Sequence, residues 1–145
     1  MKSDQITALE ERIGHHFRDR ELLERALTHS SHAHERESVA SVQADNEQLE
    51  FLGDAVLGFV VSRLLFERFP DFHEGQLSKL RAHLVSARHL AGVARRLELG
   101  EFLRLGRGEE RSGGRSKGAL MANALEALLA MRRAVEGLRL KPAKV

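Results

Sequence analysis

The sequence predicts an all-α protein. Apolar residues recur three or four positions apart in several successive segments, which is the spacing of one face of a helix. No segment shows the strict apolar and polar alternation of a half-buried strand. A chain of 145 residues is long enough for one domain with its own core and too short for two.

Two short helices and a loop are expected in the first third of the chain. Apolar residues at helical spacing predict a helix over residues 6–17 and a second over residues 22–27, which Asp19 would open. Residues 30–45 are polar, with several histidines and glutamates, and a loop is expected there.

A long helix is predicted over residues 46–69, because Pro70 cannot continue it. After Gly53 its residues are apolar nearly all round, which predicts burial on several sides. Shorter helices are expected over residues 77–85 and 90–97.

The last third of the chain combines a basic loop and a strongly apolar helix. Residues 104–118 are rich in glycine and arginine and predict a loop, although they do not spell a phosphate-binding P-loop. A final helix is expected from Ala119 to Met131, and it carries Asn123 and Glu126 one turn apart.

Composition limits the class of protein. A hydrophobic fraction of 42% and a charged fraction of 30% are typical of soluble globular domains, and the absence of cysteine excludes disulfides and thiolate metal sites. No apolar run approaches the length of a membrane span, and residues 1–5 lack the apolar core of a signal peptide. A cytoplasmic protein without a membrane partner is expected.

Charge is distributed unevenly. Residues 1–103 carry 13 Lys and Arg against 17 Asp and Glu, a net charge of −4, whereas residues 104–145 carry 10 against 4, a net charge of +6. A basic C-terminal third is typical of a polyanion-binding surface, but a solvated basic segment has the same composition.

Acidic residues are concentrated at the start of the long predicted helix. Glu47, Glu50 and Asp54 are three and four positions apart and would share one helix face, where like charges repel. A second polar pair, Asn123 and Glu126, interrupts the apolar final helix. Oxygen ligands from two helices could hold a hard divalent metal ion, as in carboxylate-lined bundles, although a solvent-exposed acidic stripe gives the same pattern.

The stretch Asn46-Glu-Gln-Leu-Glu-Phe-Leu-Gly-Asp54 resembles the signature of the ribonuclease III family, the endonucleases that cut double-stranded RNA. The resemblance extends over about residues 6–130. Further segments agree with the family in order and spacing, namely Ala26–His29, Phe69–Pro70, Glu74–Ser78, Leu99–Gly106, Ser112–Gly114 and Leu120–Leu128.

This resemblance implies a ribonuclease III-like helical endonuclease domain over residues 1–130. The sequence departs from the family after that domain, because an atypical basic C-terminal tail is expected over residues 131–145 and no double-stranded-RNA-binding domain is recognised. It implies hydrolysis of double-stranded RNA, such as ribosomal RNA precursors, by a homodimer that uses Mg²⁺, with Mn²⁺ as an alternative. The products would carry 5′-phosphate and 3′-hydroxyl ends.

The same resemblance assigns roles to individual residues. Metal ligands would be Glu50, Asn123 and Glu126, and catalytic carboxylates Asp54 and Glu126. Glu47 and Glu74 would support the site, and Phe51 would pack into the partner subunit. Phosphate contacts would come from basic residues of the loop, namely Arg104, Arg107, Arg111, Arg115 and Lys117.

Asn123 departs from the family, which usually has an aspartate at this position. An amide oxygen can bind magnesium, but it carries no negative charge and cannot act as a base. A catalytically silent relative that binds structured RNA or a protein is therefore an alternative, as is a helical interaction module with a structural acidic stripe. His29, His32 and His34 also allow a zinc site, although histidine-rich surface loops are common.

Overall fold

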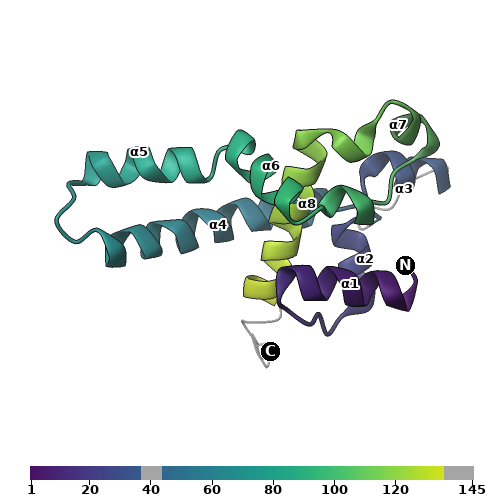
Figure 1. Cartoon of the computed structure of the whole chain (residues 1–145), viewed down its shortest axis with the longest axis horizontal. Helices are drawn as coiled ribbons and strands as arrows, with labels where there is room; N and C mark the ends of the chain where they lie inside the picture. The colour runs from purple at the N-terminus through teal and green to yellow at the C-terminus, as the bar shows by residue number, and fades with distance from the viewer. Residues whose placement is uncertain (37–43, 136–145) are drawn as a thin grey trace, which may run out of the picture.

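The protein is described by a computed structural model, which covers residues 1–36 and 44–135 and consists of packed helices (Figure 1). The described residues contain no strand, and two residues, Thr28 and Arg104, form an isolated bridge. The prediction of an all-α fold is therefore confirmed. The elements in chain order are α1 (Ser3–Ile13), α2 (Arg20–Ala26), α3 (Ser30–Arg36), α4 (Glu47–Arg68), α5 (Glu74–Leu84), α6 (Ala87–Arg96), the 3₁₀ turn η1 (Leu99–Phe102), α7 (Arg107–Arg111), the 3₁₀ turn η2 (Gly114–Ser116), α8 (Gly118–Ala130) and the π-helical turn η3 (Met131–Val135).

Helix α8 is the centre of the core. It is rich in alanine and leucine on all sides, and such a helix is stable in water only when it is surrounded by other elements. Helices α4 and α6 pack against it most extensively, and α2 also contacts it. Its buried side chains are Met121, Ala122, Ala124, Leu125, Ala127, Leu128 and Ala130.

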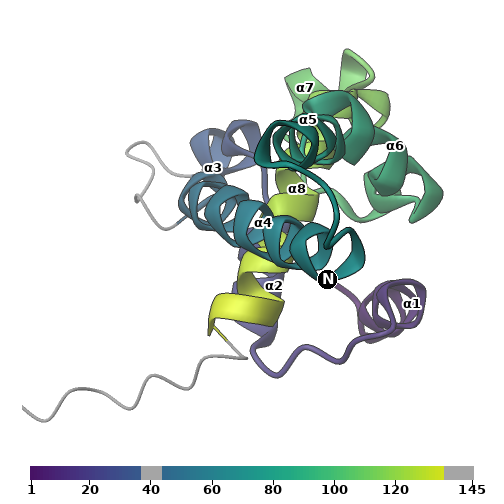
Figure 2. The ribbon, with the colours of Figure 1, turned by 90° about the vertical axis from the view of Figure 1, so that its left-hand side faces the viewer.

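Helices α4 and α5 form an antiparallel hairpin that extends from this core (Figures 1 and 2). The first half of α4 lies against α8, whereas its second half projects beyond α8 and is accompanied by α5. Phe59, Leu64 and Phe66 are 70%, 57% and 73% exposed. The prediction that the apolar second half of α4 is buried on several sides is wrong for the single chain.

Two expected loops contain short helices. Residues 30–36 form α3, and residues 107–111 form α7, where irregular structure was predicted. The two helices contact each other, and the backbone N–H of Gly106 donates a hydrogen bond of 2.9 Å to Ser31 Oγ. A Cβ atom at position 106 would lie 2.5 Å from the Ser31 carbonyl oxygen, so the close approach requires glycine. Tertiary contacts therefore stabilise helices that local propensity did not predict.

The ends of two other helices also differ from expectation. Helix α1 stops at Ile13 because Gly14 adopts a left-handed conformation (φ +67°), and its N–H donates to the Glu10 carbonyl oxygen at 2.8 Å. Met131 is fully buried, so the packed core continues into the segment expected to be a tail. Residues 136–145 of that segment, and residues 37–43 of the predicted loop, lie outside the described residues.

Over residues 1–36 and 44–135, the structure contains no helix of the length and apolar character required to cross a bilayer.

Candidate active site

Acidic side chains of α4 and α8 line one cavity of about 580 Å³. Helix α4 contributes residues from its first two turns, and α8 contributes its two polar residues, some 70 positions later in the chain. The structure thereby brings together six of the residues that the sequence singled out, namely Glu47, Glu50, Phe51, Asp54, Asn123 and Glu126.

Gly53 allows the two helices to cross closely enough to form this cavity. A Cβ atom at position 53 would lie 1.9 Å from the backbone oxygen of Glu126, a distance that real Cβ atoms do not reach. Gly53 lies between Glu50 and Asp54 in sequence, so the point of closest approach is also the point at which their carboxylates meet Glu126. The glycine therefore costs helix propensity but permits the crossing.

Hydrogen bonds from α2 and its C-terminal end fix the first turn of α4. The buried Asn46 side chain donates from Nδ2 to the Ala26 carbonyl oxygen at 3.1 Å, and its backbone N–H donates to the Thr28 carbonyl oxygen at 3.0 Å. The Arg25 guanidinium donates to the Asp45 carbonyl oxygen at 2.9 Å and to Gln48 Oε1 at 2.7 Å. These contacts surround the turn that carries Glu47 and Glu50.

Electrostatic repulsion within the cavity favours proton uptake. Burial, together with the charges of Asp54 and Glu50, raises the pKa of Glu126 from 4.5 to about 7. Burial also raises the pKa of Glu50, and the charges of Glu47 and Asp54 act in the same direction. No cationic side chain lines the cavity among the described residues, so no positive charge within it compensates for these carboxylates.

The donor set of the cavity fits a hard divalent cation in its chemistry. Carboxylate and amide oxygens are the ligands that Mg²⁺ and Mn²⁺ prefer, and a cation would offset the repulsion that raises these pKa values. The side chains are not drawn together into a finished metal centre: within the described residues, no three His, Asp or Glu side chains are arranged to hold an ion. The cavity thus has the ligand types for a metal ion but not the converged geometry.

Glu74 lies away from this cavity. It is the first residue of α5, at the far end of the hairpin, where its side chain accepts a hydrogen bond of 2.5 Å from Ser78 Oγ. Within the single chain it does not line the acidic cavity, and its supporting role stays a prediction.

Three of the five basic residues expected to contact phosphates are held by internal ion pairs. Arg104 pairs with Glu24 at 2.9 Å, and Lys117 pairs with Glu109. Arg115 pairs with Glu110 and also donates to the carbonyl oxygens of Gly100 and Leu103, both at 2.9 Å, so it holds the turns on either side of α7 together. Arg107 and Arg111 are exposed and stay candidates for phosphate contact.

The three histidines considered for zinc belong to the segment around α3. His29 Nδ1 lies 2.9 Å from Ser31 Oγ, and His34 is exposed. Among the described residues, no three side chains of this kind are arranged to hold a metal ion, and these three histidines are therefore not a zinc site in the structure.

Sequence reasoning missed the importance of Gly53 and of Arg25 for this site. A glycine inside a strongly helical pattern was the signal for Gly53, because such a residue often marks a close approach of two backbones. Arg25 gave no such signal, since its contacts to Asp45 and Gln48 span 20 and 23 positions of the chain.

Comparison with known proteins agrees with this arrangement. The family model described as Ribonuclease-III-like matches residues 19–133, which is most of the chain. The chain belongs to this family. The ribonuclease 3 of Solibacter usitatus is 59% identical to it over 125 residues, which cover 84% of this chain and 46% of that protein. The expected ribonuclease III resemblance is therefore confirmed.

Solved structures of family members share the fold. A crystal structure of the nuclease domain of ribonuclease III from Campylobacter jejuni, at 2.2 Å resolution, matches with a TM-score of 0.79 and 42% identity, covering 90% of this chain and 82% of that one. A second structure of that domain, with a TM-score of 0.78 and 42% identity, concerns flexibility in a region involved in dimer formation; the match covers 87% of this chain and 82% of that one. The chain spans about half the length of the curated relatives it matches. The matched part is therefore the nuclease-domain portion of this family.

Proposed function

We propose that this domain hydrolyses phosphodiester bonds of double-stranded RNA with the help of a divalent metal ion, leaving 5′-phosphate and 3′-hydroxyl ends. The cavity between α4 and α8 carries this proposal, because four carboxylates and one amide line it and burial with mutual repulsion raises the pKa of Glu126 to about 7. Relatives named ribonuclease 3, at 59% and 52% identity, support the same reaction.

Glu50, Asn123 and Glu126 would hold the ion, Mg²⁺ by preference and Mn²⁺ as the alternative. When bound, the ion supplies a Lewis acid that stabilises charge on the scissile phosphate and its leaving oxygen. Asp54 and Glu126 are the proposed catalytic carboxylates, because both face the cavity and can accept a hydrogen bond from the attacking water. Glu47, also on the cavity wall, would orient water there.

The substrate would be recognised by its backbone rather than by its bases. Side chains cannot read the deep, narrow major groove of an A-form duplex, so contacts to phosphates and 2′-hydroxyl groups dominate. Precursors of ribosomal RNA and other structured RNAs fit this requirement, and a cytoplasmic location would bring the domain to them.

We propose further that a second copy of the chain covers the projecting half of α4. A cavity of about 670 Å³ follows this helix, with Ala55, Phe59, Val60 and Leu64 among its lining residues, and exposed apolar patches of this kind mark interfaces. Phe51, which is 82% exposed beside the acidic cavity, would contact the partner. The structure of the Campylobacter jejuni nuclease domain, which concerns a region involved in dimer formation, supports a dimer.

A cleavage assay on a long RNA duplex tests the proposed reaction. We expect cutting with Mg²⁺ and none with EDTA, and we expect Glu126→Gln to abolish cutting without loss of folded protein. Asn123→Asp, run alongside, adds a fifth carboxylate to the cavity at the position where the family usually has an aspartate, and it should increase the rate. A native chain that binds duplex but stays silent, with activity appearing only in Asn123→Asp, would contradict the proposal and indicate a silent RNA-binding relative.

Sedimentation equilibrium tests the proposed dimer. Phe59→Glu places a charge in the middle of the apolar groove and should convert a dimer into a monomer, because an unpaired buried charge is costly. Glu67→Gln, at the polar end of the same groove, is the control and should leave the dimer intact. A native chain that is monomeric at tens of micromolar would rule the dimer out.

A further inference from the structure

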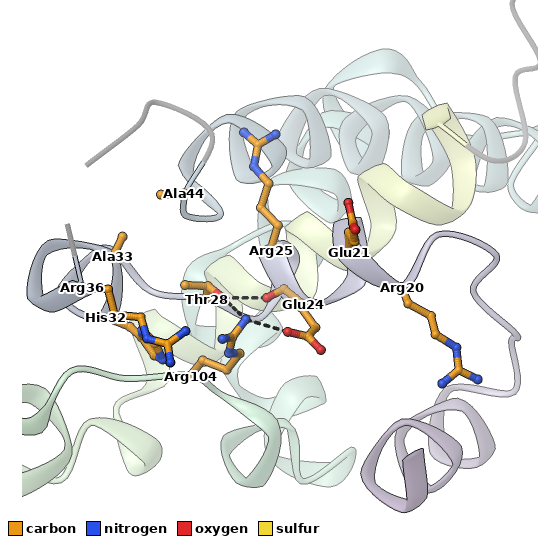
Figure 3. Close-up of a pocket in the computed structure, with 10 residues that line it drawn as sticks. All are labelled: Arg20, Glu21, Glu24, Arg25, Thr28, His32, Ala33, Arg36, Ala44 and Arg104. Atoms are coloured by element: carbon orange, nitrogen blue, oxygen red, sulfur yellow. Dashed lines mark hydrogen bonds and ion pairs between the residues drawn. The ribbon is translucent and has the colours of Figure 1, made fainter. Parts of the chain in front are cut away.

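A second cavity, of about 370 Å³, lies between α2 and α3 and is rich in arginine (Figure 3). Arg20 and Arg25 come from α2, and Arg36 comes from the end of α3. Arg104 and Thr28 form its floor, where they are hydrogen-bonded to each other at 3.3 Å. The sequence did not indicate this cavity, because its lining residues come from separate segments of the chain. The guanidinium groups point apart: that of Arg25 points toward α4, and that of Arg20 points away from Arg36 (Figure 3).

The charges in this groove do not cancel. Glu24 is already paired with Arg104 at 2.9 Å and with the N-terminal amine at 2.7 Å, and these contacts lower its pKa despite partial burial. Glu21 is exposed on α2. Arg25 donates only to neutral oxygens, those of Asp45 and Gln48, so its positive charge is retained. Neither Arg20 nor Arg36 forms an ion pair within the part of the chain that the structure describes, although the charge of Arg20 acts on Glu10 and helps to lower the pKa of that carboxyl group.

The groove continues toward α7. A neighbouring cavity of about 490 Å³ shares His32 and Arg36 with it and adds the exposed Arg107. The acidic residue there, Glu35, accepts hydrogen bonds from the backbone N–H groups of Arg107 and Gly108, which lower its pKa. The charges of Arg107 and His32 act in the same direction, so Glu35 offsets part of the positive charge in this neighbouring cavity.

The groove is also joined to the acidic cavity by direct contacts. Arg25 lines the groove and donates to Gln48, which lies in the first turn of α4 between Glu47 and Glu50. The first turn of α4 thus lies between the arginine-rich groove and the acidic cavity. A polyanion whose backbone passes the carboxylates would find arginines next to them.

We propose that the groove lined by Arg20, Arg25 and Arg36 binds backbone phosphates of the RNA duplex beside the point of cleavage. The inference rests on the proposed duplex substrate. Charge complementarity carries it, because guanidinium groups bind phosphate oxygens in bidentate fashion. Four arginines and two glutamates line the groove, and its excess of positive charge costs electrostatic repulsion that phosphates relieve. The proposed phosphate site thus lies on α2 and α3, outside the basic C-terminal third in which the sequence analysis expected a polyanion-binding surface.

Salt dependence of duplex binding tests this groove. The full chain is titrated against a fluorescent RNA duplex in EDTA, where no cutting occurs, at several KCl concentrations. The slope of log K against log salt is negative, and each lost phosphate contact should reduce its magnitude by about 0.9. Arg20→Gln/Arg36→Gln should therefore reduce the magnitude by about 1.8 and weaken binding by roughly sixtyfold near 0.1 M salt. The single variant Arg36→Gln should reduce the magnitude by about 0.9.

Two matched double variants act as controls. Arg88→Gln/Arg96→Gln removes the same charge from exposed positions on α6 and should leave the slope close to that of the native chain. Arg20→Lys/Arg36→Lys keeps the charge in the groove and should keep the slope. Thermal unfolding of every variant shows that binding is compared between folded proteins.

Several outcomes would contradict the proposal that this groove binds phosphates of the duplex. An unchanged slope in the glutamine variant, or an equal loss in the α6 control, would show that only net charge matters. Inorganic phosphate binding that the variant loses while duplex affinity is unchanged would make the groove a small-anion pocket instead. The proposed reaction can be contradicted independently of the groove. A native chain that binds duplex through these arginines but does not cut it with Mg²⁺ would contradict the proposed hydrolysis, while the proposed phosphate site would still be supported.

Discussion

The end of α1 and the crossing of α4 with α8 each withdraw a glutamate from water, and the two carboxyl groups respond in opposite directions. Glu10 is the more buried of the two, with only 8% of its surface exposed, yet its pKa is lowered. Burial alone would raise the pKa of Glu10, but the backbone N–H of Phe17 and the ring of His16, each at 2.8 Å, outweigh it. At Glu126 burial acts together with the charges of Asp54 and Glu50, and the pKa rises to about 7.

This contrast shows that partners, rather than depth, decide whether a buried carboxylate is a structural or a reactive group. Glu10 closes the turn after α1 with donors that the fold itself supplies, and it needs no ligand. The carboxylates at the α4–α8 crossing share their cavity with the neutral Asn123 amide and, among the described residues, with no cation, so the fold leaves their charge to be compensated by a ligand.

The largest effect is expected from Gly53→Ala, which tests how the acidic cavity depends on the helix crossing. The added Cβ atom would meet the Glu126 backbone, so the helices must separate, at a cost of about 3 kcal/mol or more. Gly58→Ala, one turn further along α4, meets no atom within 4 Å and should stabilise the chain by about 0.5–1 kcal/mol. Urea unfolding measures both; equal effects would contradict the crossing geometry.

A smaller effect is expected from Glu10→Gln, which removes the charge that the α1 turn uses. Loss of charge-assisted hydrogen bonds to Phe17 and His16 should destabilise the chain by about 2 kcal/mol. The exposed neighbour Glu11 is the control, and Glu11→Gln should change the free energy of unfolding by less than about 0.5 kcal/mol. A Glu10→Gln variant as stable as the native chain would mean that these bonds contribute nothing net.

The smallest effect is a difference in pH dependence, measured by thermal unfolding in EDTA. Between pH 4.5 and about 7 the unfolded chain ionises Glu126 while the folded chain keeps the proton, so this group lowers stability as the pH rises. After allowance for solvent screening we expect about 1 kcal/mol. Glu126→Gln should abolish that decrease and be more stable than the native chain at pH 8.

Glu10 should show the opposite sign in the same experiment. Its lowered pKa means that its contribution is present above pH 4.5 and is lost on further acidification. The difference between native chain and Glu10→Gln should therefore shrink below pH 4.5. If both variants changed the profile in the same direction, the contrast between the two carboxylates would be wrong.

Much of the fold and of the acidic cavity could be predicted from the sequence. Helical spacing predicted an all-α fold, and Pro70 placed the end of α4 within a residue or two. The offsets of Glu47, Glu50 and Asp54 placed them on one face, and the polar pair Asn123 and Glu126 was visible against an apolar background. These are local properties, since the periodicity of a helix fixes which side chains share a face.

Other features depended on contacts between distant segments. The helices α3 and α7 stabilise each other across some 75 positions, and neither is predicted by its own residues. The sequence likewise did not predict the internal pairing of Arg104 and Arg115 or the exposure of Phe59. It also did not predict that Arg20, Arg25 and Arg36 line one cavity. Charge counts could not distinguish an arginine with a partner from one without.

The sequence alone therefore determined which residues could act, because residue chemistry and helical period are local. Only the tertiary structure decided which of them meet, because that depends on where two backbones can approach. Gly53 is the clearest case. The sequence shows a glycine inside a helix, and the structure shows that the α8 backbone at Glu126 occupies the space that a side chain at position 53 would fill.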